Sequence, residues 1–329
     1  MNLLRRSFVK RSMAALALGP LLGGTRSLGA SLGNGKLVDV DGVPTRYFEG
    51  GSGEPMVLVH GGHFGSNISA LAWTQIFNHL ARYFHVYAVD KLGQGHTGNP
   101  ASDGDYRMQA TIRHVHQFVE TLGLRRVHLV GNSRGALPVT RIAAEFPEMV
   151  QSLVLFNSRT LAPDDPSLRS RTAPPAAPAP TLESIRETST RSAFTKDYIT
   201  EDYLKARLQI ALLPKIKEAE ERLKRLTSQW VERNSDKVKE NPLLRSIWWY
   251  RDAKKETMDL IQAGGLKAPT LIVWGFNDGS APHTLGINLY RTISAVVDRA
   301  ELHFMNRCGH RAFAEYPEQV TRLMVDFIK

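Results

Sequence analysis

From residue 36 onward, short apolar runs alternate with longer stretches in which apolar residues recur at helical spacing. Turn residues bound the apolar runs, which are rich in Val and Leu, as is typical of strands buried on both faces of a parallel sheet. The predicted strands are residues 56–59, 86–89, 127–130, 153–156, 271–274 and 302–305. The predicted helices are residues 71–83, 107–122, 136–146 and, after Pro317, 318–329. This alternation predicts an α/β fold with a mainly parallel central sheet flanked by helices.

Two further runs precede this pattern. Residues 36–40 and 43–48 are separated only by Asp41 and Gly42. An Asp-Gly pair between two apolar segments favours a tight turn with positive φ. We therefore expect the chain to open with a hairpin.

The alternation stops between residues 160 and 265. Residues 173–180 are an Ala/Pro tract, which is a poor helix or strand former, and residues 199–213 and 216–233 are helical stretches rich in Glu, Lys and Arg. An insertion here would cover the carboxyl edge of the sheet, where open α/β sheets bind ligands. The predicted units are a core of residues 31–159 and 266–329 and a helical lid of residues 160–265.

Charge and composition exclude several functions. The net charge is +10, but five of the 42 basic residues lie in the first thirty positions, which contain no acid. The remaining excess is scattered, so we expect no nucleic-acid partner. The single cysteine, Cys308, allows neither an intrachain disulfide nor a cysteine-based zinc site. No apolar stretch reaches the roughly 18 residues of a membrane span.

The first thirty residues predict an export signal. Arg5 and Arg6 are followed by Phe8 and Lys10, then by a weakly apolar run and small residues up to Ala30. This order is typical of a secretory signal, and the paired arginines resemble a twin-arginine signal. We expect residues 1–30 to engage the twin-arginine export machinery and the mature protein to be periplasmic or secreted. The alternative is a basic N-terminus that is never removed.

A Gly-x-Ser-x-Gly motif follows the predicted strand 127–130. It reads Gly131-Asn132-Ser133-Arg134-Gly135 and precedes a predicted helix, which is the strand–turn–helix context of a nucleophile elbow. The glycines are needed because a serine on such a sharp turn leaves no room for flanking side chains. Ser133 is the candidate nucleophile, and the alternative is a Gly-rich turn with a capping serine.

A serine nucleophile needs a base and an acid that orients it, in the order Ser, Asp, His for this strand–turn–helix motif. Asp278 follows the strand 271–274, and we prefer it to the neighbouring Asn277 on spacing. His310 follows the last strand in the loop Cys308-Gly309-His310 and is the candidate base. The rival acids Asp90, Asp103 and Asp105 precede the serine, against this order.

The turn His60-Gly61-Gly62-His63 follows the strand 56–59. Its glycines would let the backbone approach an oxyanion, and the amides of Gly62 and Arg134 could form the oxyanion hole. His60 is interpreted as a structural histidine. No set of residues has metal-ligand spacing, so we expect no metal and no cofactor.

On these residues the chain resembles the α/β-hydrolase superfamily, and more narrowly the meta-cleavage-product hydrolases, over about residues 36–329. The resemblance is carried by residues 60–62, 90–95, 131–133, 198–207 and 302–329. It implies hydrolysis of a carbon–carbon bond in a dienoic ring-fission product by Ser133, Asp278 and His310. It also implies that Arg207 binds the substrate carboxylate and that Asn132 lies in the same polar subsite.

Three positions differ from that family. Arg311 stands where tryptophan is usual after the histidine, Ser280 where an apolar residue is usual, and Arg134 where methionine is frequent. Arg311 and Ser280 are expected to make the leaving-group side more polar and to contact the substrate. We expect a small carbonyl or ester compound as the substrate, and association as a homo-oligomer is left open.

The first functional hypothesis is a serine-dependent carbon–carbon bond hydrolase. The second is an exported carboxylesterase or lactonase that uses the same three residues and forms an acyl-enzyme. The polar departures favour this second hypothesis. A ligand-binding sensor whose lid closes on a slowly turned-over ligand, and a cofactor-free haloperoxidase or perhydrolase, are further alternatives.

Overall fold

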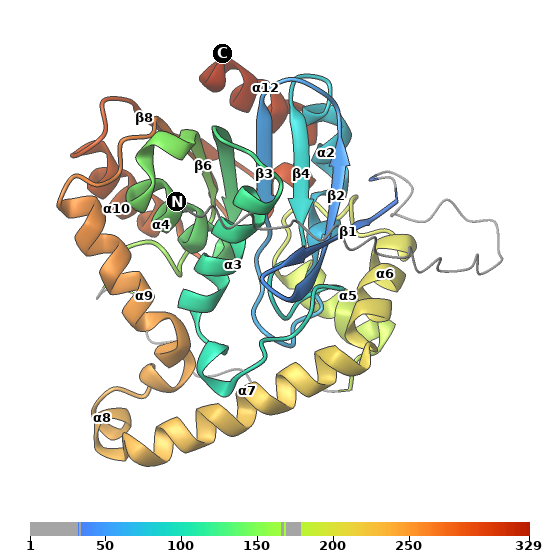
Figure 1. Ribbon diagram of the computed structural model, residues 1–329, viewed down its shortest axis with the longest axis vertical. Coiled ribbons are helices and arrows are strands. Elements are labelled where there is room, and N and C mark those ends of the chain that lie inside the picture. The colour runs from blue at the N-terminus through green and yellow to red at the C-terminus, as the bar shows by residue number, and fades with distance from the viewer. Residues whose placement is uncertain (1–31, 33, 166–167, 169–178) are drawn as a thin grey trace, which may run out of the picture.

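The computed structural model describes residues 32, 34–165, 168 and 179–329. The predicted signal, residues 1–30, lies outside the described residues, as does all of the Ala/Pro tract except Ala179 and Pro180. In the described part of the chain, eight strands form one sheet in the order β1-β2-β4-β3-β5-β6-β7-β8 (Figure 1). Their bounds are β1 Lys36–Val40, β2 Val43–Gly50, β3 Pro55–Val59, β4 His85–Val89, β5 Val127–Asn132, β6 Val150–Phe156, β7 Thr270–Gly275 and β8 Ala300–Met305.

The predicted mainly parallel sheet is confirmed. β1 pairs with β2 and β2 with β4 in antiparallel fashion, and the remaining pairs are parallel. The predicted hairpin is also present, since Val40 pairs with Val43 across Asp41 and Gly42, whose φ angles are +52° and +79°. These positive angles are those of a primed turn, whose twist matches that of the two strands.

Both faces of the sheet are covered by helices. One apolar core lies between the sheet and α3 (Met108–Thr121), α4 (Ala136–Glu145) and α10 (His283–Ser294). A second core lies on the other face beneath α2 (Thr74–Leu80) and α12 (Pro317–Ile328). Central strands such as β3 and β5 are buried along their whole length or nearly so, which explains why they are apolar without alternation.

The segment between β6 and β7 is helical. Its described helices are α5 (Leu182–Arg191), α6 (Glu201–Ala211), α7 (Pro214–Arg233), α8 (Ser235–Glu240) and α9 (Leu244–Gln262). Figure 1 shows α5, α6 and α7 beyond the arrowheads of β3 and β4, that is, at the carboxyl edge of the sheet.

Two helices were predicted in this segment, and α6 and α7 match them closely. The sequence interpretation did not single out α5 or α9. α9 packs on α3 and α4, and its Ala253 and Ile261 belong to the core of the sheet domain. The predicted helix 71–83 begins as a 3-10 turn at Ala70–Trp73, capped by Ser69, before α2.

Candidate active site

Ser133 lies at the turn between β5 and α4. Its φ is +54°, a strained left-handed conformation for a residue with a side chain. A Cβ on Gly131 would come within 2.6 Å of the Ala136 Cα, and one on Gly135 within 2.2 Å of the Val59 carbonyl oxygen. Both glycines are therefore required by backbone atoms that cannot move aside. This is the geometry of a nucleophile elbow.

Asp278 and His310 come together from two neighbouring strands, β7 and β8. The Nδ1–H of His310 donates to Asp278 Oδ2 at 2.6 Å. Asn157, directly after β6, donates its amide to the same oxygen at 2.9 Å. Burial alone would raise the pKa of Asp278, but the His310 contact and hydrogen bonds from Ser280 lower it to about 2. The carboxylate therefore stays ionised and holds the imidazole by Nδ1.

The loop of His310 lies next to the serine elbow. Asn132, the residue before Ser133, donates its side-chain amide to the His310 carbonyl at 3.4 Å. Within the described residues, no hydrogen bond joins the Ser133 hydroxyl to the imidazole. Such contacts are often long in unliganded enzymes and shorten when substrate binds.

The turn after β3 runs beside the serine. A Cβ on Gly61 would be 3.0 Å from the Ser133 Cβ, so the two backbones are in close approach. Gly62 has a φ of +80° and leaves no space for a side chain, which would meet the Ser66 Oγ at 2.4 Å. This geometry puts the peptide groups of residues 61–62 next to Ser133, at the side expected for an oxyanion hole.

His60 fixes this turn. Its Nδ1 donates to the Gly61 carbonyl at 2.7 Å, and its Nε2 accepts from the Lys91 amide at 3.1 Å. Burial lowers the pKa of His60 to about 3, so the ring is neutral, as the two hydrogen bonds require. The histidine ties the loop after β3 to the loop after β4.

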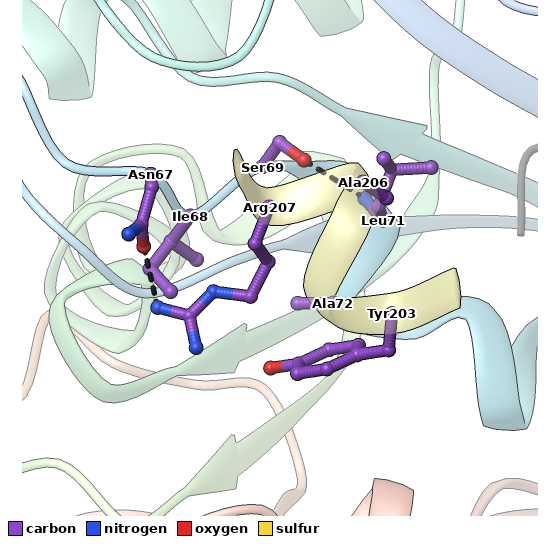
Figure 2. Close-up of a pocket in the computed structure, with 8 residues that line it drawn as sticks. All are labelled: Asn67, Ile68, Ser69, Leu71, Ala72, Tyr203, Ala206 and Arg207. Carbon is purple, nitrogen blue, oxygen red and sulfur yellow. Dashed lines mark hydrogen bonds between the residues drawn. The ribbon is translucent and has the colours of Figure 1, made fainter. Parts of the chain in front are cut away.

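Arg207 lines a pocket beside these loops. Its guanidinium donates to Asn67 Oδ1 and to the Ser189 hydroxyl, both neutral acceptors. Among the described residues no carboxylate pairs with it. Figure 2 shows the side chain reaching from α6 towards Asn67, with the ring of Tyr203 below. The pocket is lined by Asn67, Ile68, Ser69, Leu71, Ala72, Tyr203, Ala206 and Arg207.

The structure gives Arg311 and Ser280 hydrogen-bond partners within the protein. Arg311 is buried and donates to the Tyr203 hydroxyl at 3.1 Å, so it is joined to the residue that lines the pocket of Arg207. The Ser280 hydroxyl donates to Asp278 Oδ1 at 2.6 Å and lies 3.0 Å from His310 Nδ1. Its hydroxyl is thus hydrogen-bonded to the acid of the Asp278–His310 pair.

Tyr203 is held between two cations. Burial would raise the pKa of its phenol, but the Arg311 and Arg207 guanidiniums outweigh this effect and lower it. The Arg207 guanidinium also lies 5.6 Å from the centre of the Tyr203 ring. Tyr203 therefore connects the two arginines.

The rival acids have other partners. Asp90 is buried, pairs with Arg46 at 2.6 Å and accepts the Ala70 amide at 2.7 Å. Asp103 is bound at the surface by Arg222 and Arg225. These contacts leave Asp278 as the carboxylate beside His310.

Sequence interpretation missed Asn67, Asn157 and Ser189. Asn157 could have been found, because it directly follows a strand at the edge that also carries Ser133 and Asp278. Asn67 and Ser189 lie in a loop and a helix without any local motif, and only packing brings them to Arg207.

Two kinds of feature are absent from the described residues. No group of three or more His, Cys, Asp or Glu side chains could hold a metal ion. Likewise, none of the described helices is both long and apolar enough to cross a membrane.

The chain is similar to known proteins over most of its length. The model of the alpha/beta hydrolase fold family matches residues 54–317. The 2-hydroxy-6-oxo-6-(2'-aminophenyl)hexa-2,4-dienoic acid hydrolase of Metapseudomonas resinovorans is 27% identical, over 89% of this chain and 90% of that protein. The 2-hydroxy-6-oxononadienedioate/2-hydroxy-6-oxononatrienedioate hydrolase of Burkholderia vietnamiensis (strain G4 / LMG 22486) is 27% identical, over 88% and 93%.

A solved structure of a mutant meta-cleavage product hydrolase, CumD, superposes with a TM-score of 0.68 at 24% identity, covering 91% of this chain and 98% of that one. At this identity the likeness supports the fold alone. The family model, by contrast, spans most of the chain, including β3, the serine elbow and the loops of Asp278 and His310. The chain belongs to the alpha/beta hydrolase fold family.

Proposed function

We propose that the protein is a serine-dependent hydrolase that cleaves a carbon–carbon bond in a 2-hydroxy-6-oxo-dienoate. The observation that carries this proposal is the 2.6 Å contact of His310 with Asp278 beside the Ser133 elbow, next to a pocket whose Arg207 has no carboxylate partner in the described part of the chain. The names of the relatives, which hydrolyse substrates of this class, support the same choice.

In this proposal Ser133, Asp278 and His310 act as a triad. Asp278 keeps the proton of the imidazole on Nδ1, so Nε2 is free to take a proton from Ser133 or from water. The serine or the water then adds to the ketone carbonyl. The amides of Gly62 and Arg134 stabilise the oxyanion, and loss of one such donor typically costs about 3 kcal/mol.

The bond that breaks joins the carbonyl carbon to its neighbour on the dienoate side. The hydroxyl of water ends on the acyl carbon, giving a carboxylic acid, and a proton ends on the carbon of the dienoate fragment. Before this step the dienol becomes a ketone, which makes that fragment a better leaving group. His310 and Ser133 are the groups that move these protons.

Arg207 is assigned to the carboxylate at the dienoate end. The Arg207 guanidinium is partly buried and donates to the neutral Asn67 and Ser189, with no carboxylate partner among the described residues, so binding of an anion there is favoured. A substrate carboxylate would accept two parallel hydrogen bonds from it. Asn132, the residue before Ser133, is assigned to the same polar subsite.

Residues 160–265 are proposed as the lid. The support is that α6 carries Arg207 and Tyr203 to a pocket that they share with residues 67–72, which follow β3. Substrate would have to pass this segment, so closure over it would exclude water from the reaction.

The test is turnover of a ring-fission dienoate, measured by loss of its visible absorbance, beside hydrolysis of short aryl esters. We expect efficient dienoate cleavage that Ser133→Ala abolishes, and weak ester turnover. Fast ester hydrolysis with an untouched dienoate would overturn the carbon–carbon assignment in favour of a carboxylesterase or lactonase. Unchanged dienoate turnover in Ser133→Ala would overturn the assignment of the nucleophile.

We also propose that residues 1–30 direct twin-arginine export to the periplasm or beyond. The support is the Arg5-Arg6 pair, the weakly apolar run behind it and the absence of acids up to residue 30. The test is fractionation of cells that express the full chain. Export should be lost when Arg5 and Arg6 are both replaced by Lys, and an unchanged distribution would contradict the proposal.

A further inference from the structure

Two basic side chains that the proposed mechanism does not use lie directly beside the serine elbow. Lys91 follows β4, is 1% exposed, and its Nζ donates to the Gly62 carbonyl at 3.2 Å. Arg134 follows Ser133, and its guanidinium lies 5.7 Å from the centre of the Trp249 ring on α9. Both therefore adjoin the peptide groups proposed as the oxyanion hole.

Neither basic side chain has an acidic partner in the part of the chain that the structure describes. Among the described residues, neither Lys91 nor Arg134 forms an ion pair or a hydrogen bond with a carboxylate. The Nε of Arg134 is buried without any hydrogen-bond partner. Burial lowers the pKa of Lys91 well below its usual range, and the Arg134 charge lowers it further.

The pKa of His63 is affected by the same two basic side chains. Burial lowers the pKa of its imidazole to about 4, and Arg134 and Lys91 contribute to this shift. Its Nδ1 donates to the Phe64 carbonyl at 2.7 Å, and its ring lies 6.4 Å from that of Trp249. Three ionisable groups thus meet between the loops of β3, β4 and β5 and α9, without an anion among them.

These two basic side chains are not expected to stabilise the fold. Burying a cation without a counter-ion is costly, and apolar residues of similar size are often as stable or more so. His63 and Arg134 are only partly buried, so each keeps some surface that a ligand can reach. A bound anion would supply the missing counter-ion, and guanidinium and ammonium groups are the usual ligands of a carboxylate.

The pocket of Arg207 is built from other parts of the chain. It uses residues 67–72 and α6, whereas the Lys91–Arg134 pair uses the loops of β4 and β5 beneath α9. One substrate that places its reacting carbonyl at Ser133 can therefore meet two separate cationic sites.

We propose that Lys91 and Arg134 form a second anion subsite, which binds a carboxylate on the acyl fragment of the substrate, so that the preferred substrate is a diacid. This proposal rests on the proposed function, because the acyl fragment that carries the second carboxylate is defined by the carbon–carbon bond that is cleaved there. It adds the class of acyl group on the substrate: one that ends in a negative charge rather than in an alkyl or aryl group.

The experiment compares two ring-fission dienoates that differ only at the end of the acyl chain, one with a carboxylate and one with a methyl group. The readout is the ratio of their kcat/KM values. General damage to the site lowers both values alike and therefore leaves this ratio unchanged. In the wild-type protein we expect the diacid to be favoured by at least about tenfold. Lys91→Met and Arg134→Met should each bring the ratio close to one, and Arg134→Lys should keep part of the preference.

Lys217→Met, an exposed lysine on α7, and Arg322→Met, an exposed arginine on α12, are the matched controls and should keep the wild-type ratio. A wild-type ratio near one, or a ratio that Lys91→Met and Arg134→Met leave unchanged, would overturn the second subsite.

Binding separates this proposal from the proposed function. The Ser133→Ala variant is titrated with both dienoates, and their dissociation constants are obtained from the shift in visible absorbance. If the wild-type protein cleaves neither compound, the proposed function fails, yet tighter binding of the diacid that Lys91→Met removes would still support the subsite. Equal binding of the two compounds would overturn it.

Discussion

The Nδ1 of His310 and the Oδ2 of Asp278 lie 2.6 Å apart, although the two residues come from loops behind different strands. The carboxylate has no exposed surface and also accepts hydrogen bonds from Asn157 and Ser280. These contacts leave the imidazole one orientation, with Nε2 as its free nitrogen. A base held in this way depends on its acid for both tautomer and position.

Asp278→Asn should lower kcat by about 10³ to 10⁴-fold, because an amide would favour the wrong imidazole tautomer. Steady-state kinetics on the ring-fission dienoate measures the effect. Asp103→Asn is the control, since Asp103 pairs with arginines at the surface, and it should leave kcat unchanged. A loss of less than tenfold in Asp278→Asn would argue against this carboxylate as the orienting acid.

Ser280→Ala distinguishes two roles for that hydroxyl. If Ser280 supports Asp278 and His310, its loss should lower kcat by about tenfold, in line with the loss of a hydrogen bond to a charged group, and leave KM unchanged. If Ser280 contacts the substrate, KM should rise instead. Whether kcat falls or KM rises therefore decides between the two roles of Ser280.

Arg207→Met should lower kcat/KM for the dienoate by about 100-fold, mainly through KM, because a bidentate charge-assisted pair to the substrate carboxylate is lost. Turnover of a neutral aryl ester should change far less. Arg186→Met, on the exposed face of the neighbouring α5, serves as the control. An equal loss on both substrates would mean that Arg207 supports the packing of the inserted helices rather than binding of the carboxylate.

The low pKa of Asp278 predicts a pH dependence of stability. Its pKa of about 2 in the folded protein lies below the value of about 4 in an unfolded chain, so ionised Asp278 stabilises the fold above about pH 4. This contribution should fade as the pH falls from about 4 towards 2. Urea unfolding of the wild-type protein and of Asp278→Asn at several pH values measures it. A gap between the two proteins that widens towards low pH would contradict this assignment.

Gly135→Ala should destabilise the protein by more than about 4 kcal/mol or prevent folding, because the new Cβ would lie 2.2 Å from the Val59 oxygen and 2.5 Å from the His60 oxygen. Gly104→Ala, whose Cβ would meet only the Ser102 hydroxyl at 3.6 Å, should be nearly neutral. Thermal unfolding of both variants provides the comparison. A stable Gly135→Ala protein would mean that the elbow can relax.

Much of the sheet and the serine elbow could be predicted because they depend on local patterns. A buried parallel strand needs a short apolar run, an elbow needs glycines on both sides of its serine, and each signal lies within a few residues. The chain order of strands then places Ser133, Asp278 and His310 at one edge. α9 was harder to recognise, because it packs on α3 and α4 as well as on the inserted helix α7, and this weakens its apolar periodicity.

By itself, the sequence determined the α/β pattern and the residue types at the ends of the strands. Tertiary structure alone decided which polar groups meet. Arg207 reaches Asn67, 140 positions earlier, and Arg311 reaches Tyr203, 108 positions earlier. The Ser280 hydroxyl donates to Asp278, and Lys91 and Arg134 both lie at the serine elbow with no carboxylate partner among the described residues. The physical reason is that a strand or turn is specified by its neighbours in the chain, whereas the partner of a buried charge is specified by packing across the whole fold.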